Sequence, residues 1–149
     1  MAIAPFPHTY TVSLIDDQLL APGRTSVAIG APPQFGGTEP VWSPEDLLAG
    51  ATLACLKTTF DAYARKEGLL VGDWIGRATA TLEKTRAGPA FTGIALEVDL
   101  TVAAQDAVRA RETVDRAERH CLVSAALKIP ITLVVRIDER QDEPAQGVA

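Results

Sequence analysis

Cys55 and Cys121 are the two residues of this 149-residue sequence whose chemistry most needs an explanation. They are the only cysteines in the chain, and they lie too far apart in sequence for a CxxC redox or zinc motif. A thiolate can be oxidised to a sulfenic acid, and a second thiol can condense with that acid to give a disulfide. Two inert thiols buried between packed helices explain the same spacing equally well.

Cys55 lies within a segment predicted to be helical from Pro44 until near Gly68. Ser43 is a good N-cap, proline suits the first helical position, and the acidic pair that follows complements the helix dipole. Steps of three and four residues relate Cys55 to two apolar positions, Leu48 and Ala51. The sequence therefore predicts that Cys55 belongs to the apolar face of this helix.

The remaining elements follow from alternating and helical patterns. Strands are predicted over residues 8–15, 25–30, 69–85, 91–102 and 131–137, with turn residues at 16–24 and a loop at 31–40. A second amphipathic helix is predicted over 104–120, immediately before Cys121, with a short helical turn after it. The order β-β-α-β-β-α-β predicts an α+β fold with mostly antiparallel sheets, one domain over 3–138 and a polar tail over 139–149.

Composition excludes several classes of protein. The net charge of −5 and the pI near 5.0 argue against nucleic acid, because phosphate binding needs a basic surface. No apolar run of 18 residues suggests a membrane span, and the first residues do not resemble a signal peptide. We therefore expect a cytoplasmic protein whose cysteines rest as thiols.

Other motifs for catalysis or cofactor binding are missing from the sequence. It has no phosphate-binding glycine motif, no GxSxG and no HExxH, and its two histidines and two cysteines form no ligand cluster, so neither a metal nor a cofactor is expected. His120 adjoins Cys121 rather than Cys55, which leaves a cysteine–histidine pair weakly supported. Burial on an apolar face would raise the pKa of a thiol, so reactivity at Cys55 requires a nearby cation.

Two local sequences carry a resemblance to a known family. TEPVWSPEDLLAGATLACLKTTF resembles the first cysteine helix of the OsmC/Ohr family, in which the cysteine follows a glutamate by ten residues, as Cys55 follows Glu45. AERHCLVSAAL resembles the second cysteine motif, H-C-P-[VY]-S, with Leu122 in place of the proline. The two motifs together make the resemblance fairly specific, and it covers nearly the whole chain.

The resemblance implies an intertwined homodimer built around a long central helix, with no metal or organic cofactor. Cys55 would be the peroxidatic cysteine and Cys121 the resolving one. The substrates would be organic hydroperoxides and, less well, hydrogen peroxide, and a dithiol reductant would restore the thiols. An interface pocket is expected around Cys55, with the apolar residues Leu48, Leu53 and Phe60, and Phe35 or Trp42, as candidate lining.

The family also places an arginine from the N-terminal strand region against the thiolate, steadied by the glutamate that corresponds to Glu45. Arg24 is the only arginine before Cys55 in this chain, and its position does not match that of the Ohr branch well. Two alternatives to an enzyme therefore stay open. One is a similar dimer that binds a small apolar ligand without turnover, and the other is a dimer with no ligand.

Overall fold

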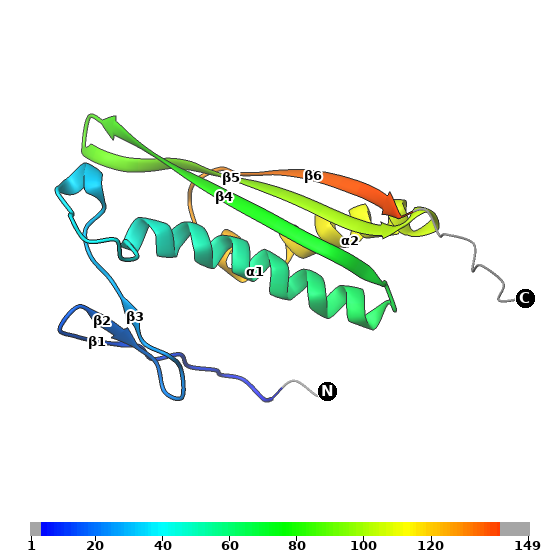
Figure 1. The fold of residues 1–149 in the computed structure, drawn as a ribbon, viewed down its shortest axis with the longest axis horizontal. Coiled ribbons are helices and arrows are strands. Elements are labelled where there is room, and N and C mark those ends of the chain that lie inside the picture. The colour runs from blue at the N-terminus through cyan, green and yellow to red at the C-terminus, as the bar shows by residue number, and fades with distance from the viewer. Residues whose placement is uncertain (1–3, 141–149) are drawn as a thin grey trace, which may run out of the picture. The chain divides into compact units, whose positions relative to one another are not determined.

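The computed structural model describes residues 4–140, which form two compact units (Figure 1). The boundary falls between Leu47 and Leu48, inside the first turns of the long helix. Each unit is described by itself below.

The N-terminal unit holds a small antiparallel sheet in the order β1-β2-β3. Its strands are β1 (Ser13–Ile15), β2 (Gln18–Leu20) and β3 (Val27–Ala28). β1 is shorter than the strand predicted over 8–15, and β2 lies in a segment predicted to be a turn. The actual turn is only Asp16 and Asp17, whose positive φ angles of 46° and 59° suit a tight hairpin. The predicted loop contains a short 3₁₀ turn, η1 (Pro33–Phe35).

The long helix α1 (Pro44–Lys66) begins where the sequence predicts. Ser43 and Asp46 cap it reciprocally: the Asp46 amide donates to Ser43 Oγ at 3.1 Å, and the Ser43 amide donates to Asp46 Oδ2 at 3.0 Å. This is the geometry of a capping box, with aspartate in the place of the usual glutamate. The helix start is thus fixed by local sequence.

The C-terminal unit is built on a sheet in the order β4-β5-β6. The strands are β4 (Val71–Thr85), β5 (Gly88–Ala103) and β6 (Ile131–Arg140). β4 and β5 pair antiparallel, whereas β5 and β6 pair parallel. The parallel pair requires a crossover, which η2 (Ala104–Asp106), α2 (Ala107–Arg119) and α3 (Leu122–Ala126) provide.

α1 and α2 lie on the same face of this sheet (Figure 1). Alternate residues of β5 point into the core beneath them, as predicted: Ile94, Leu96, Val98, Leu100 and Val102 are all buried. From α1 the buried residues are Thr52, Leu56, Phe60 and Ala64. The predicted stripe was therefore wrong by one position, since Ala51 is exposed and Cys55 is half-buried at the border of the core.

The fold is α+β and mostly antiparallel, as predicted, but the predicted element order omits two elements. Three strands, not two, precede α1, and two helices, not one, separate β5 from β6. The predicted tail begins at 139, although β6 continues to Arg140; residues 141–149 lie outside the described residues. The single domain over 3–138 stays a prediction.

Candidate active site

One row of α1 faces the far end of α2. Cys55, Thr59 and Tyr63 follow one another at steps of four residues, and all three are half-buried. Tyr63 makes an edge contact with the His120 ring at 5.8 Å, and the Arg116 guanidinium lies 5.0 Å from the centre of the Tyr63 ring. The row is therefore directed toward the chain segment that joins α2 to α3.

That segment carries Cys121, which is 1% exposed. Cys121 is the N-cap of α3, and its Sγ accepts a hydrogen bond from the Ser124 amide at 3.5 Å. Because the extended backbone at Cys121 separates α2 from α3, its side chain points to the helix start rather than along either helix. Both cysteines are free thiols.

The surroundings of Cys55, the Cys121 thiol among them, lower its pKa. Burial raises this pKa and is the largest single effect, but four donor groups near the sulfur together outweigh it. In order of size the donors are the Val123 amide, the Cys121 thiol, the Leu122 amide and the Thr59 hydroxyl. The site therefore favours the thiolate at Cys55.

The pKa of Cys121, by contrast, is raised. Burial is again the largest effect, the hydroxyl and amide of Ser124 oppose it, and the sulfur and negative charge of Cys55 add to the rise. Of the two thiols, Cys55 therefore loses its proton first, and Cys121 keeps its own to higher pH. This asymmetry makes Cys55 the better nucleophile of the two.

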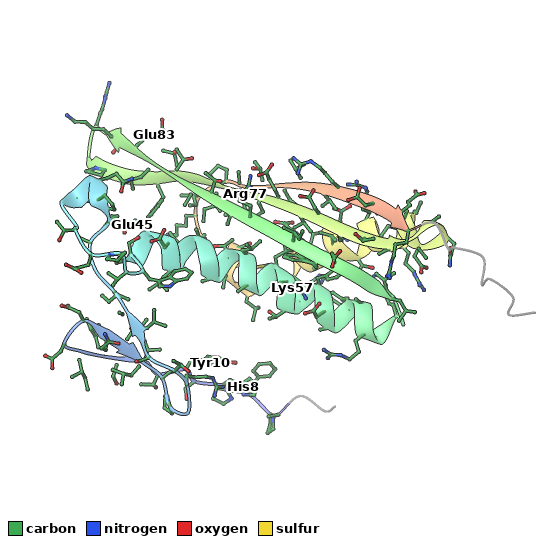
Figure 2. The ribbon with its side chains drawn as sticks, in the orientation of Figure 1. His8, Tyr10, Glu45, Lys57, Arg77 and Glu83 are labelled. Atoms are coloured by element: carbon green, nitrogen blue, oxygen red, sulfur yellow. The ribbon has the colours of Figure 1, made fainter. Side chains whose placement is uncertain are left out.

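Glu45 lies at the start of α1, ten residues before Cys55 (Figure 2). Ten residues of helix rise by about 15 Å, so the carboxylate is well separated from the sulfur within one chain. Glu45 Oε2 is buried and has no hydrogen-bond partner within residues 4–140. Arg24 belongs to the N-terminal unit, where it is exposed and its Nη1 donates to the Gly23 carbonyl at 3.4 Å.

The expected pocket lining needs one correction. Phe60 is 1% exposed and packs against Trp74, with 6.5 Å between ring centres, so it is a core residue. Leu48 and Leu53 are partly buried against the same core. Phe35 and Trp42 lie in the N-terminal unit, about half exposed.

A shallow depression of about 240 Å³ opens beside the second cysteine. Its lining comes from the end of α2, from α3 and from β6: Glu118, Arg119, Cys121, Ser124, Ala125 and Ile131. This depression gives a small molecule a place to approach the α2–α3 turn, where the sulfur itself is covered.

Sequence reasoning did not identify three groups around the thiols: Thr59, Ser124 and the amides of residues 122 and 123. The spacing of four residues from Cys55 could have revealed Thr59, because such residues are neighbours on a helix. The amides had no signal in the sequence, since they depend on how α3 is placed. His120 adjoins the pair but turns its ring to Tyr63, with Nδ1 2.8 Å from the Arg116 carbonyl.

Within residues 4–140, no group of three or more histidine, cysteine or acidic side chains is arranged to hold a metal ion. Over the same residues, no helix has the length and apolar character needed to cross a membrane.

The sequence of this chain is similar to that of known proteins. A family model described as OsmC-like protein matches residues 37–136. The protein named Peroxiredoxin OsmC from Escherichia coli K12 is 32% identical over 91 residues, which are 61% of this chain and 64% of that protein, so the match spans less than two thirds of the relative. A protein of the same name from Shigella flexneri matches to the same extent.

Solved structures share the fold. An OsmC-like protein of unknown function from Vibrio cholerae has a TM-score of 0.72 at 16% identity, covering 80% of this chain and 82% of the other. An organic hydroperoxide resistance protein from Elizabethkingia anophelis has a TM-score of 0.70 at 15% identity, covering 92% and 100%. At such low identity these similarities establish the fold alone.

Proposed function

The chain belongs to the OsmC-like family, and from that premise we propose that it is a thiol-dependent peroxidase that reduces organic hydroperoxides. One observation carries the proposal: the Cys121 thiol is among the groups that lower the pKa of Cys55, and Cys55 in turn helps to raise that of Cys121. A nucleophilic thiolate beside a protonated thiol is the arrangement that peroxide reduction through a disulfide requires.

The first step is attack of the Cys55 thiolate on the terminal oxygen of a hydroperoxide. The S–O bond forms as the O–O bond breaks, so the sulfur becomes a sulfenic acid and the alkoxide leaves as an alcohol after taking up a proton. The sulfur is oxidised by two electrons, and the peroxide is reduced by the same two. The hydrogen bonds that hold the thiolate also orient it for this attack.

The second step joins the two cysteines. The Cys121 sulfur attacks the Cys55 sulfenic acid, an S–S bond forms, and water leaves with the thiol proton and the hydroxyl of the sulfenic acid. The Cys121 thiol already affects the pKa of Cys55, which supports a direct second step between the two sulfurs. A dithiol reductant then restores both thiols by thiol–disulfide exchange. No metal or organic cofactor takes part in these steps.

We also propose that Arg24 and Glu45 support the reaction as a pair. A buried carboxylate oxygen without a partner, such as Glu45 Oε2, is costly and calls for a cation. Within residues 4–140 Arg24 is in no ion pair, so it is free to serve as that cation, from its own chain or from a second copy. Because Glu45 and Cys55 of one chain lie about 15 Å apart along α1, a guanidinium held by Glu45 would lower the pKa of Cys55 only in a second copy of the chain.

We propose that the active form is a homodimer. Apolar side chains of the N-terminal unit are strongly exposed: Tyr10 is 92% exposed, Ile15 60% and Leu14 58%. Exposed apolar side chains of this size are candidates for an interaction surface, and a second copy is the partner that the family suggests. A mass in solution of one chain, 15.8 kDa, instead of two would contradict this.

Substitution of each cysteine tests the enzymatic function. With cumene hydroperoxide and a small dithiol as reductant, Cys55→Ser should abolish consumption of the peroxide, because the nucleophile is lost. In a parallel assay without the dithiol, which could itself reduce a sulfenic acid, Cys121→Ser should still consume about one equivalent per chain and keep Cys55 as the sulfenic acid, because no second thiol resolves it.

The result separates the enzyme from the ligand-binding alternative. Equal, slow peroxide consumption by the wild type and both variants would reject the peroxidase. Binding of an apolar probe with both thiols intact after excess hydroperoxide would then support a dimer that holds an apolar ligand.

A further inference from the structure

Glu67 is the first residue after α1, and hydrogen bonds fix the backbone on both sides of it. The Gly68 amide donates to the Arg65 carbonyl at 3.3 Å, and the Leu69 amide donates to the Ala64 carbonyl at 2.9 Å. Gly68 has a left-handed φ of 63°, and the side chains of Leu69 and Ala64 are buried. This pattern is a Schellman motif, which ends the helix at a defined residue and so holds Glu67 in place.

Three residues of α2 converge on Glu67. Arg109, Thr113 and Arg116 follow one another at steps of four and three residues, so they share one face of the helix. Arg116 Nη2 lies 2.5 Å from Glu67 Oε1, Thr113 Oγ1 lies 3.0 Å from Oε2, and Arg109 Nη1 donates to the Glu67 backbone carbonyl at 3.4 Å. Thr113 is fully buried, and the Glu67 side chain is 21% exposed. Both carboxylate oxygens and the carbonyl of Glu67 are thus bonded to α2.

From Arg116 the contacts continue to the residue before Cys121. The Arg116 carbonyl accepts from the His120 amide at 3.2 Å and lies 2.8 Å from His120 Nδ1. The rings of His120 and Tyr63 meet edge-on at 5.8 Å, and the Arg116 guanidinium lies 5.0 Å from the centre of the Tyr63 ring. The last turn of α2, which leads into Cys121, is therefore attached to α1 by its side chains.

We propose that Glu67 is a positioning residue for the second step of the proposed reaction: through Arg116 it holds the end of α2, and with it Cys121, where the two cysteines can join. This rests on the proposed function for its consequence in peroxide turnover. Glu67 follows Cys55 by twelve residues, about 18 Å along a helix, so it acts on the sulfurs only through α2.

The second step depends on position more than the first. Attack on a peroxide needs only the Cys55 thiolate, whereas the S–S bond forms only if the Cys121 sulfur reaches Cys55 as its S–OH bond breaks and water leaves. A misplacement of about 1 Å can slow such a step by about a hundredfold.

The core keeps α2 on the sheet without help from Glu67. Ala110, Val114 and Ala117 are fully buried there. Removing the Glu67 carboxylate should therefore release the last turn of α2, which leads into Cys121, and leave the rest of the helix in place.

The test measures disulfide formation between Cys55 and Cys121 in the full chain without peroxide. Diamide oxidises two thiols to a disulfide, and its N=N bond takes up the two electrons and two protons. At diamide concentrations where the rate no longer depends on diamide, the observed step is closure of the disulfide, followed by peptide mapping without reduction. Glu67→Ala should slow closure by roughly ten- to a hundredfold. Alkylation of Cys55 by iodoacetamide, which needs no second thiol, should keep its wild-type rate.

Two further variants make the result specific. Glu67→Gln keeps the size of the side chain and one acceptor oxygen, so it should slow closure less than alanine does. Glu97→Ala removes a carboxylate of β5 that bonds Arg136 at 3.0 Å, and it should leave closure unchanged. Should Glu67→Ala fail to fold, Glu67→Gln decides alone.

Three results would overturn the role of Glu67. They are wild-type closure in both Glu67 variants, equal slowing in Glu97→Ala, and a loss of Cys55 alkylation as large as the loss of closure. The last would mean that the substitution disturbs the unit as a whole.

A single turnover with cumene hydroperoxide provides the second measurement. In Glu67→Ala the first oxidation of Cys55 should keep its rate, and its sulfenic acid, trapped with dimedone, should persist longer by the same factor as closure is slowed. A sulfenic acid resolved as fast as in the wild type would overturn the proposal. A wild type that consumes no peroxide would reject the proposed function, while closure by diamide would still decide whether Glu67 positions Cys121.

Discussion

At Cys55, two opposing effects decide whether the thiol reacts. Burial raises the pKa of Cys55, which protects a thiol from oxidants, while the surrounding donors lower it below its ordinary value. The Leu122 and Val123 amides at the start of α3 are among the groups that lower this pKa. Reactivity at this site is therefore a property of the local arrangement of donors.

One substitution tests whether Arg24 acts on the Cys55 thiolate. If its guanidinium approaches the thiolate, Arg24→Ala should raise the pKa of Cys55 by about one unit or more, because a nearby opposite charge favours the ionised form. Peptide-resolved alkylation across pH measures the shift. The control is Arg77→Ala, an exposed arginine of β4 that lies 3.7 Å from Glu97 (Figure 2). A Cys55 titration unchanged by Arg24→Ala would rule out the proposed cation.

At the scale of elements, an ion pair and a hydrogen bond connect the end of α1 to α2 near the candidate active site. Glu67, just after α1, accepts from Arg116 Nη2 at 2.5 Å and from Thr113 Oγ1 at 3.0 Å, and Thr113 is fully buried. Arg116 in turn lies over Tyr63. Because these contacts fix the end of α2, they also fix where Cys121 begins α3.

The cap of α1 gives a pH-dependent prediction. The Ser43 amide and hydroxyl hold the pKa of Asp46 below its ordinary value of 3.8, so this carboxylate contributes stability above that value and loses it as the pH falls through the lower folded-state pKa. Asp46→Asn should cost about 0.5 kcal/mol at neutral pH, a small effect because the group is exposed.

Thermal unfolding followed at pH 7 and near pH 3 measures this contribution. The difference between wild type and Asp46→Asn should shrink at the acidic pH. Asp73→Asn, an exposed acid of β4, serves as the control and should show no comparable trend. A difference that stays constant across this range would mean that the cap does not depend on the charge.

Some elements could be predicted from the local sequence, and others could not. The start of α1 followed from Ser43 and Pro44, and the buried side of β5 followed from strict alternation. β2 was missed because two consecutive aspartates with positive φ make a turn far shorter than polarity suggested. The parallel pairing of β5 with β6 is a tertiary fact that no local pattern encodes.

Some groups of the candidate active site could likewise be predicted from the sequence, and others could not. The motifs around Cys55 and Cys121 indicated the pair, and helical spacing could have added Thr59. The α3 amides could not be foreseen, because Leu122 replaces the expected proline and keeps an N–H at that position, which helps to lower the pKa of Cys55. This departure from the family pattern supplies a donor that proline lacks.

At the scale of the whole molecule, the β4-β5-β6 sheet supports the helices that carry both cysteines. Its outer face carries ion pairs, with Arg136 bonded to Glu97 and Asp99 at 3.0 Å each. The exposed apolar side chains of the N-terminal unit suit a second copy. We therefore expect the complete site to exist in the dimer.

The central claim is that Cys55 and Cys121 of one chain form a disulfide when a hydroperoxide is reduced. The most direct measurement is to treat the reduced protein with one equivalent of cumene hydroperoxide, count the remaining thiols and map the peptides without reduction. We predict loss of both thiols and a Cys55–Cys121 linkage within single chains. Two intact thiols, or a linkage between chains, would contradict the account.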